Sequence, residues 1–353
     1  MKHLNKINLL IILSILLSAC GAPALANAPS QEAALPNADS TQPPNLVPIP
    51  PDATATPTPF QPLLPTAVFT PTEIPTLTPV PTSTPAPALP VPDLPVEPVS
   101  EATNQLNILL LGSDKRPWET GFRTDTIILV SLNPSKGTVS LLSFPRDLYV
   151  NIPGWTTDRI NTAFFHGGFK TLAATLDSNF GVRPTHYILI NFRSFKQIVD
   201  SLGGLQVKVG TALNDRYPGK GWITIPKGTV KMNADMALWY VRSRKTSNDF
   251  ARNRRQQEVI LALFEKFLSL DALRRVPEFY KMYKKSVSTD MTLSDGLAYL
   301  PLALQLATDP SRIKRYYISP QDVWNYITPG GAMVLLPRED QIRKIVKQAL
   351  AGK

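Results

Sequence analysis

The stretch Leu106–Asp114, LNILLLGSD, is a short apolar run that ends in Gly-Ser-Asp. A continuous run of this length is typical of a strand buried on both faces, as in a sheet that is covered by helices. Polar residues directly after such a strand are well placed to form a functional loop, because the strand fixes where the loop begins. The stretch therefore predicts an α/β domain with a polar site at the end of this strand.

The chain from Asn104 onward continues with strand and helix patterns in alternation. Strands are expected at 124–133, 137–150, 185–192, 205–209, 222–225 and 229–232, and near 313–319 and 331–336. Helices are expected from a cap at Asp158 to a stop at Gly181, at 193–204 with a closing Gly pair, at 233–241 and 249–270, near 271–284 and 292–307, and from Pro337. Because no repeat or boundary divides it, 104–353 is interpreted as one α/β domain.

The first twenty residues have the pattern of a bacterial lipoprotein signal peptide. Lys2 and Lys6 precede the apolar run Ile7–Leu17, and Leu-Ser-Ala leads to Cys20, the one cysteine of the chain. The run is shorter than the about 20 apolar residues that span a bilayer, but it suits the core of a signal peptide. We therefore expect 1–20 to be a signal peptide and Cys20 to be lipidated. The mature chain would then be held at the extracytoplasmic face of the cell membrane; an uncleaved anchor is the alternative.

Residues 21–103 have the composition of a linker. They hold 22 of the chain's 35 prolines, and no Lys or Arg lies between Lys6 and Lys115. Proline removes backbone donors and fixes φ, so this stretch is unsuited to helices and to paired strands. We expect a disordered stalk that reaches on the order of 200 Å when fully extended in the polyproline conformation. A spacer without a tuned length fits the composition equally well.

The positive charge of the chain is concentrated in the part that is expected to fold. Beyond residue 103 there are 35 of the 37 Lys and Arg but 20 of the 27 Asp and Glu, which gives the domain a net charge of +15. A field of this strength favours anionic partners such as nucleic acid, an anionic membrane or a phosphate ester. Because the chain is expected to be exported, nucleic acid is not expected among its partners.

Charged residues gather at four places near strand and helix ends. They are Asp114 with Arg116, Arg123 with Asp125, Arg146 with Asp147 after Pro145, and the run Tyr240–Gln256, YVRSRKTSNDFARNRRQ, with Arg242, Arg244, Lys245, Arg252, Arg254 and Arg255 around Asp249. Guanidinium groups match phosphate oxygens two at a time. Two carboxylates can hold a Mg²⁺ ion that also binds phosphate oxygens. Together the clusters suit a diphosphate.

Each cluster taken singly has an ordinary structural explanation. Asp114 could form a turn or cap, and Arg146 with Asp147 could be a surface pair. The segment RNRRQ could be the solvated face of a helix that Asp249 caps. Spacing alone leaves these explanations open.

Seven motifs in sequence resemble the LytR–CpsA–Psr family. They are NILLLGSDKR, GFRTDTIILVSLNP, VSLLSFPRDLYVNIPG, RINTAF, YILINFRSFKQIVDSLGGLQV, MNADMALWYVRSR and DFARNRRQQEVILAL, and they run from about Leu106 to Phe267. The resemblance implies an α/β/α sandwich with a mixed central β-sheet and an apolar tunnel for a lipid tail. It also implies an extracytoplasmic phosphotransferase that moves a glycopolymer from a polyprenyl-pyrophosphate carrier onto peptidoglycan.

The resemblance also implies roles for individual residues. Asp114 and Asp125 match aspartates that are associated with Mg²⁺ in the family. The arginines around the pyrophosphate are matched by Arg123, Arg146, Arg242, Arg244 and Arg252. Asp249 and Gln256 match polar residues of the same catalytic site. Arg254 and Arg255 rank lower, because they are expected to face solvent.

Two other functions compete with the transferase. A pyrophosphatase that hydrolyses the carrier diphosphate would use the same residues, with water in place of the acceptor. A tethered module that binds polyanions or the cell wall, or a regulator, would need no catalysis. The paired Asp114 and Asp125 argue against simple polyanion binding, because carboxylates repel anions unless a metal intervenes. The aromatic and apolar residues Phe164, Phe165, Phe192, Phe195, Leu261, Leu263, Phe264 and Phe267 are expected in the core, some of them along the tunnel.

Overall fold

The computed structural model describes residues 97–114, 122–268 and 287–353. The chain divides into two units, Met1–Ser83 and Thr84–Lys353, and every described residue belongs to the second. The expected signal peptide, most of the expected linker and the helix expected near 271–284 lie outside the described residues. Across the described ranges, no helix combines the length and the apolar character needed to cross a membrane.

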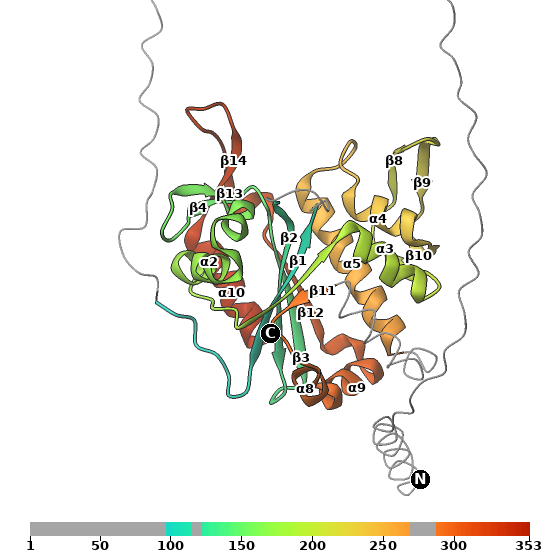
Figure 1. Ribbon diagram of the computed structural model, residues 1–353, viewed down its shortest axis with the longest axis horizontal. Helices are drawn as coiled ribbons and strands as arrows, with labels where there is room; N and C mark the ends of the chain where they lie inside the picture. Colours follow the sequence, from blue (N-terminus) through green and yellow to red (C-terminus); the bar gives the residue numbers. More distant parts are fainter. Residues whose placement is uncertain (1–96, 115–121, 269–286) are drawn as a thin grey trace, which may run out of the picture. The chain divides into compact units, whose positions relative to one another are not determined.

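A six-stranded mixed sheet forms the centre of the domain, in the order β11-β6-β1-β2-β3-β12 (Figure 1). Its strands are β1 (Leu106–Ser113), β2 (Thr124–Asn133), β3 (Thr138–Phe144), β6 (His186–Asn191), β11 (Val287–Thr289) and β12 (Ile313–Tyr317). β1 pairs antiparallel with β2 and parallel with β6, and β3 pairs antiparallel with β2 and parallel with β12. The expected buried strand at Leu106–Asp114 is therefore an inner strand of the sheet.

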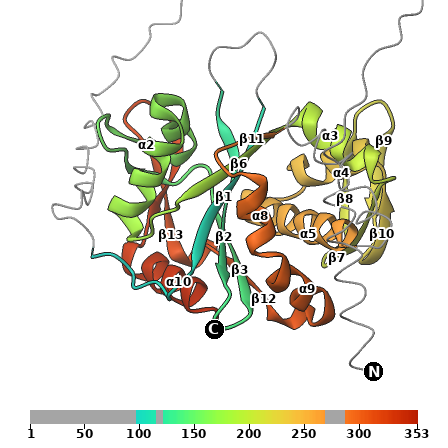
Figure 2. The same ribbon diagram turned by 60° about the horizontal axis from the view of Figure 1, so that its bottom comes forward.

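Helices cover both faces of this sheet, as Figures 1 and 2 show. On one face, Leu109 and Leu111 of β1 pack in a core cluster with α2 (Ala163–Phe180) and α10 (Glu339–Ala351). On the other face, Ile108 packs in a cluster with α5 (Asp249–Phe267) and α9 (Leu300–Thr308), which follows α8 (Leu293–Ala298). Successive strand residues point to opposite faces, so the unbroken apolar run in β1 serves both cores. The expected α/β/α sandwich with a mixed central sheet is confirmed.

A smaller lobe packs against α5. It consists of α3 (Phe192–Ser201), α4 (Ala234–Arg242), β7 (Leu205–Val209), β8 (Leu213–Tyr217), β9 (Gly221–Ile225) and β10 (Gly228–Met232). The expected Gly pair ends α3: Gly203 and Gly204 have φ of 73° and 88°, a conformation that glycine adopts without strain. A Cβ on Gly204 would lie 2.8 Å from the Met232 carbonyl oxygen, so β10 can approach closely only because this residue is glycine.

Two further hairpins and three short 3₁₀ turns complete the described elements. They are β4 (Tyr149–Asn151) with β5 (Thr157–Arg159), β13 (Val323–Ile327) with β14 (Met333–Pro337), and the turns η2 (Ile160–Thr162), η3 (Pro310–Arg312) and η4 (Pro320–Asp322). The expected strand at 137–150 is divided at Pro145, because its second part leaves the sheet and pairs with β5. The sequence predicted a helix cap at Asp158, and this prediction is wrong. Asp158 lies in β5, and α2 begins after Thr162.

Several chain segments meet at one edge of the central sheet. β1 and β3 end there, and the antiparallel β2 begins there, because Ser113 pairs with Thr124 and Phe144 pairs with Ile127. The backbone N–H of Asn161, at the start of the turn to α2, donates to the Arg146 carbonyl oxygen, and the Arg252 side chain brings the first turn of α5 to the Asp125 carbonyl oxygen. This edge therefore collects the polar residues that follow or precede the buried strands.

Candidate active site

Arg146 is the centre of a cluster of arginines and carboxylates at this edge. Its Nη1 lies 2.9 Å from Asp125 Oδ1, and its Nε lies 3.3 Å from Asp147 Oδ2 and 3.8 Å from Asp249 Oδ1. Burial lowers the pKa of Arg146, but the three nearby carboxylates outweigh it, so the pKa rises above its ordinary value. The guanidinium of Arg146 therefore stays charged while it holds three separate chain segments together.

Asp249 and Arg252 form a second ion pair within the first turn of α5. Arg252 Nη2 lies 2.9 Å from Asp249 Oδ1 and donates to the Asp125 carbonyl oxygen at 3.2 Å. Burial raises the pKa of the Asp249 carboxyl against the opposing effect of Arg252. Burial also lowers the pKa of Arg252 against the effect of Asp249. Both charged groups are thus desolvated, and further counter-charge from a ligand would interact strongly in this environment.

The start of α5 is fixed by a side-chain cap. Asn248 Oδ1 accepts a hydrogen bond from the backbone N–H of Ala251 at 2.9 Å, and it satisfies one of the free donors at the helix N-terminus. Asp249 is therefore the first helical residue. The alternative explanation from the sequence, in which Asp249 caps this helix, is wrong. Its carboxylate is free to pair with arginines, and it also suits the positive end of the helix dipole.

The structure adds Arg159 and Asn161, which the sequence analysis did not single out as site residues, and it places Asp147 within the cluster. Asp147 is held between Arg146 and Arg159, whose Nη1 lies 3.7 Å from Asp147 Oδ1. The amide of Asn161 reaches Asp125 Oδ1 at 3.5 Å. Arg159 and Asn161 lie in the RINTAF motif and Asp147 lies beside Arg146, so the signal was present. Sequence alone did not indicate that the β4–β5 hairpin returns the chain to the same place.

The predicted residues differ in how far they join this cluster. Arg244 approaches Asp249 Oδ1 at 3.8 Å but is half exposed. Arg242 is exposed, and its guanidinium carbon lies 4.2 Å from the centre of the Phe192 ring. Asp114 and Arg123 are exposed beside the paired residues Ser113 and Thr124. Within the described ranges no ion pair or hydrogen bond of Asp114, Arg123 or Arg242 is found, so these side chains are available to a ligand.

Arg255 has a structural role that contradicts its expected exposure. It is 6% exposed, its Nε donates to the Tyr240 carbonyl oxygen at 2.9 Å, and its Nη2 donates to the Ser243 carbonyl oxygen and to Ser247 Oγ. Its neighbour Arg254 is exposed, as expected. Position 255 faces the turn between α4 and α5, and α5 therefore fixes the segment that carries Arg242 and Arg244.

A buried carboxylate holds the same turn from its other side. Asp215 accepts hydrogen bonds from the Ser243 hydroxyl and, at 3.0 Å, from the backbone N–H of Lys245. Burial acts to raise the pKa of Asp215, but these bonds and that of the Arg216 N–H outweigh it, and the pKa is lowered. The turn with the exposed arginines is thus fixed by one buried anion and one buried cation.

Several buried polar atoms at the site lack a partner within the part of the chain that the structure describes. They are Nε of Arg252, Oε1 of Gln256, Oδ1 of Asn161 and Nδ2 of Asn253. Buried polar groups in proteins are nearly always hydrogen-bonded, so such a group needs an explanation, for example an ion or water. Four of these atoms at one sheet edge, together with an excess of arginine, indicate a site built to receive a polar anionic ligand.

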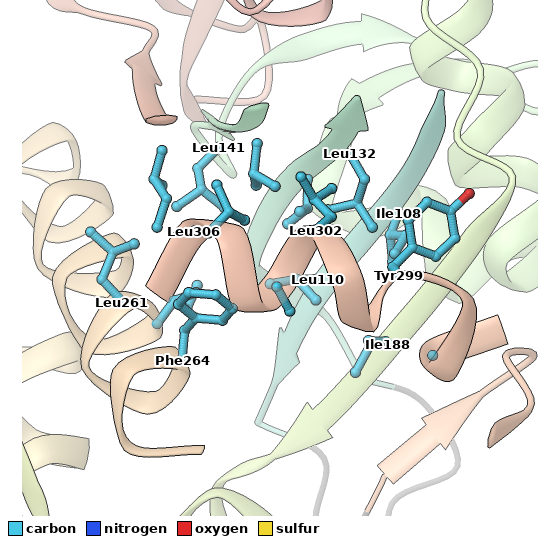
Figure 3. A pocket seen from close by; sticks show the side chains of 16 residues that line it. Ile108, Leu110, Leu132, Leu141, Ile188, Leu261, Phe264, Tyr299, Leu302 and Leu306 are labelled. Carbon is cyan, nitrogen blue, oxygen red and sulfur yellow. The ribbon is translucent and has the colours of Figure 1, made fainter. Parts of the chain in front are cut away.

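An apolar cavity of about 280 Å³ lies on the face of the sheet that α5 covers (Figure 3), and its lining on α5 begins at Ile260, eight residues or about 12 Å along the helix from Arg252. Its walls come from strands β1, β2, β3, β6 and β12 and from helices α5, α8 and α9. Leu261 and Phe264, two of the residues expected in the core or along a tunnel, line it together with Leu302 and Leu306. Phe165, by contrast, is not in the core: it is 57% exposed.

One row of side chains on α5 runs from the charged cluster to this cavity. Arg252, Gln256, Ile260 and Phe264 follow one another at intervals of four residues; residues four apart are neighbours on a helix, and such a row winds slowly around the helix axis. Arg252 lies in the ion-pair cluster, and Ile260 and Phe264 line the cavity. A ligand with an anionic head and an apolar tail would match this gradient along a single helix.

The fold and this edge define a class of protein: an α/β/α sandwich with an arginine-rich anion site next to an apolar cavity. Comparison with known proteins makes the class specific. The chain belongs to the LytR_cpsA_psr family, whose sequence pattern matches residues 87–350. The resemblance found in the sequence motifs is thereby confirmed.

Relatives in this family are described as cell-wall transferases. The chain is 33% identical over 192 residues to the polyisoprenyl-teichoic acid–peptidoglycan teichoic acid transferase TagU of Bacillus licheniformis, a match that covers 54% of this chain and 61% of that protein. It is 29% identical over 231 residues to the corresponding transferase TagT of Bacillus subtilis, a match that covers 63% of this chain and 72% of that protein. The chain thus spans about three fifths of the length of the first of these relatives.

Solved structures of the family have the same fold. The crystal structure of TagV from B. subtilis has a TM-score of 0.58 and 25% identity and covers 70% of this chain and 97% of that one. The structure described as TagT bound to LIIa-WTA has a TM-score of 0.56 and 25% identity, and the match covers 72% of this chain and 94% of that one. The match extends over nearly all of each solved chain, so the sandwich is shared as a whole.

The contrast between Arg255 and Arg254 can be tested directly. We expect Arg255→Met to lower the free energy of unfolding by about 3 kcal/mol, because the carbonyl oxygens of Tyr240 and Ser243 lose a buried donor. Arg254→Ala, at the adjacent exposed position, should change it by less than about 0.5 kcal/mol. Denaturant unfolding of the two variants and the unchanged protein measures both. Equal stability of the two variants would show that Arg255 does not hold the turn.

Proposed function

We propose that this protein is an extracytoplasmic phosphotransferase that moves a glycopolymer from a polyprenyl-pyrophosphate carrier onto peptidoglycan. The observation that carries the proposal is the row of α5 side chains that runs from the arginine cluster to the apolar cavity. A polyprenyl pyrophosphate has the matching form, with a diphosphate at one end and a long apolar chain attached to it. The names of the teichoic acid transferases among its relatives support the same reaction.

In this proposal the arginines bind the diphosphate and the cavity takes the first part of the prenyl chain. Arg146 and Arg252 supply fixed charge from the protein interior, and the exposed Arg123, Arg242 and Arg244 close around the phosphate oxygens. The acceptor hydroxyl oxygen bonds to the phosphorus nearer the glycan, and the bond from that phosphorus to the bridging oxygen breaks. The hydroxyl proton is released, and polyprenyl phosphate leaves. Fixed positive charge lowers the barrier by stabilising the charge that develops on the bridging oxygen.

The carboxylates near the cluster fit a Mg²⁺ ion. Within the described residues, both hydrogen bonds to the Asp125 side chain, from Arg146 and Asn161, go to Oδ1, which leaves Oδ2 for a cation. Asp114 is exposed at the adjoining strand end, and the unpartnered Oδ1 of Asn161 adds another oxygen. Among the described residues, no group of three or more His, Cys, Asp or Glu side chains could hold a metal, so phosphate oxygens would complete the coordination. Bound Mg²⁺ would supply neutralisation of the diphosphate charge.

The N-terminal region would hold the domain near its substrate. Lipidation of Cys20 would anchor the chain at the outer face of the cell membrane, where polyprenyl carriers reside. The proline-rich linker would let the domain reach the wall. Partners would then be the lipid-linked glycan, peptidoglycan and the membrane itself, and nucleic acid is not expected.

A transfer assay tests the reaction and its site together. Full-length protein in detergent is incubated with a labelled polyprenyl-diphosphate glycan, Mg²⁺ and peptidoglycan fragments. We expect label on the peptidoglycan, with a rate about 100-fold lower for both variants: Asp125→Ala removes a proposed Mg²⁺ ligand and the ion-pair partner of Arg146, and Arg242→Ala removes a positive charge from the diphosphate site. Arg254→Ala, at an exposed arginine of α5, should retain the normal rate.

The assay also separates the competing functions. Free labelled glycan phosphate in place of labelled peptidoglycan would identify a pyrophosphatase. Donor binding without any product, and without an effect of Asp125→Ala, would identify a non-catalytic binding module. Either result would contradict the proposed transferase.

The role of the cavity in lipid binding has its own test. Ala303 lines the cavity on α9, whereas its neighbour Leu304 is exposed. We expect Ala303→Phe to raise the half-saturating concentration of a long-chain polyprenyl donor about tenfold, because it fills space that the chain would occupy. A donor with a very short prenyl chain should be affected less, and Leu304→Phe should affect neither donor. An equal effect on both donors would argue against a prenyl site in the cavity.

The anchor is tested by substitution of its cysteine. We expect Cys20→Ser to abolish incorporation of labelled fatty acid and to reduce the share of the protein in the membrane fraction. Labelling of cells that express each form, followed by fractionation, measures both. Fatty-acid labelling that persists in the variant would disprove lipidation at Cys20.

A further inference from the structure

Three aromatic rings form an exposed platform beside the candidate active site. The Trp155 ring is stacked on the His166 ring, with centroids 4.2 Å apart and planes 22° apart. Phe165 meets the same His166 ring edge-on at 5.3 Å. Trp155 is 61% and Phe165 57% exposed. Large aromatic side chains grouped on a surface mark interaction sites, so this platform is interpreted as a surface for a partner.

Both chain segments that carry the platform, the β4–β5 turn and the start of α2, lead directly to residues of the site. Trp155 lies in the turn between β4 and β5, and β5 ends at Arg159, which pairs with Asp147 of the cluster. Four residues of extended chain cover about 13 Å at about 3.3 Å per residue. His166 lies in the first turn of α2, which follows Asn161 directly through η2. The rings therefore lie within a few sugar units of the reacting phosphate in the proposed reaction.

The chemistry of the platform suits a sugar ring. One face of a pyranose carries carbon-bound hydrogens and is apolar, while its hydroxyl groups lie around the rim. Such a face packs on the flat surface of Trp or His, as apolar groups do on aromatic rings in general. The exposed Thr156 beside Trp155 can bond to rim hydroxyls. Trp155 and Phe165, the two exposed rings, carry no charge, so the outer surface of the platform suits the apolar face of a sugar ring better than an anion.

The position of the platform distinguishes the acceptor from the donor. α2 packs on one face of the central sheet, and α5 and α9, which line the apolar cavity, pack on the other. In phosphoryl transfer the attacking and leaving oxygens lie roughly in line on opposite sides of phosphorus. If the prenyl phosphate leaves toward the cavity, the attacking hydroxyl arrives from the face of α2 and the β4–β5 hairpin. That is where the aromatic platform lies.

We infer that Trp155, His166 and Phe165 form the acceptor subsite and bind the glycan strand of peptidoglycan by stacking on its sugar rings. The inference rests on the proposed transferase and assigns its acceptor side. Trp155 is the member to substitute, because it is the more exposed of the two exposed rings and stacks on His166. Its loss removes the outer surface of the platform and leaves the ion-pair cluster unchanged.

The test measures transfer as a function of acceptor concentration. Full-length protein is supplied with saturating lipid-linked donor and with uncrosslinked glycan oligomers prepared from peptidoglycan. Trp155→Ala should raise the half-saturating acceptor concentration about tenfold, the effect of one lost aromatic stack, with the half-saturating donor concentration unchanged. Trp155→Phe should restore most of the loss. Trp222→Ala is the matched control: Trp222 is 63% exposed on the β8–β9 hairpin of the smaller lobe, and its loss should have no effect.

A binding measurement with the same glycan oligomers, without donor, distinguishes a failure of the platform from a failure of the transferase. Titration calorimetry measures this binding for the unchanged protein, Trp155→Ala and Trp222→Ala. If oligomer binding weakens in Trp155→Ala alone, the platform is supported, even if no form of the protein transfers label. The lack of transfer would then refute only the transferase. Normal transfer and normal oligomer binding by Trp155→Ala would overturn the platform and leave the transferase intact. A higher donor requirement in Trp155→Ala would also overturn it, because the platform would then serve the donor.

Discussion

The ion pair between Asp249 and Arg252 is the interaction on which the arrangement of the site depends. Burial opposes the charged form of both side chains, as the directions of their pKa shifts show. Buried charges are retained only where partners surround them, since an unpaired one costs several kcal/mol. Here Arg146, from the end of β3, supplies the additional partner. The first turn of α5 and the end of β3 are therefore held in one geometry, and in the proposed reaction that geometry would set where the diphosphate binds.

The same helix is fixed against the sheet by an uncharged group. Gln257 is fully buried, and its amide donates to the Ser143 hydroxyl and to the carbonyl oxygens of Leu141 and Tyr316. One side chain thus bonds to two neighbouring strands, β3 and β12. Because α5 cannot slide or rotate without breaking these bonds, Arg252 and the cavity-lining residues keep a constant separation. A rigid separation suits a ligand whose charged and apolar parts are covalently joined.

The sequence predicted the parts of this structure that rest on local patterns. The apolar run at Leu106–Asp114 and the Gly pair after α3 require little context, and both were located correctly. Arg255 and Asp158 were misjudged, because the side of a helix or the partner of a hairpin is decided by tertiary packing. Short amphipathic strands such as β8, which carries the buried Asp215, resemble loops until their partner is known. For the same reason the ion pair of Asp147 with Arg159 could not be read from spacing.

Phe165 illustrates why aromatic residues are difficult to assign from sequence. An apolar residue near the start of a helix is normally expected in the core, and Phe164 next to it does pack against the core cluster. Neighbouring residues on a helix point in directions about 100° apart, and here Phe165 points away from the side on which Phe164 contacts the core. Phe165 contacts the His166 ring, which in turn stacks on Trp155. The central sheet then separates two kinds of apolar surface: a partly open cavity suited to a flexible chain on the α5 side, and an exposed aromatic platform suited to rigid rings on the α2 side. A reaction that joins a lipid-linked donor to a polysaccharide acceptor needs both, on opposite sides of one charged edge.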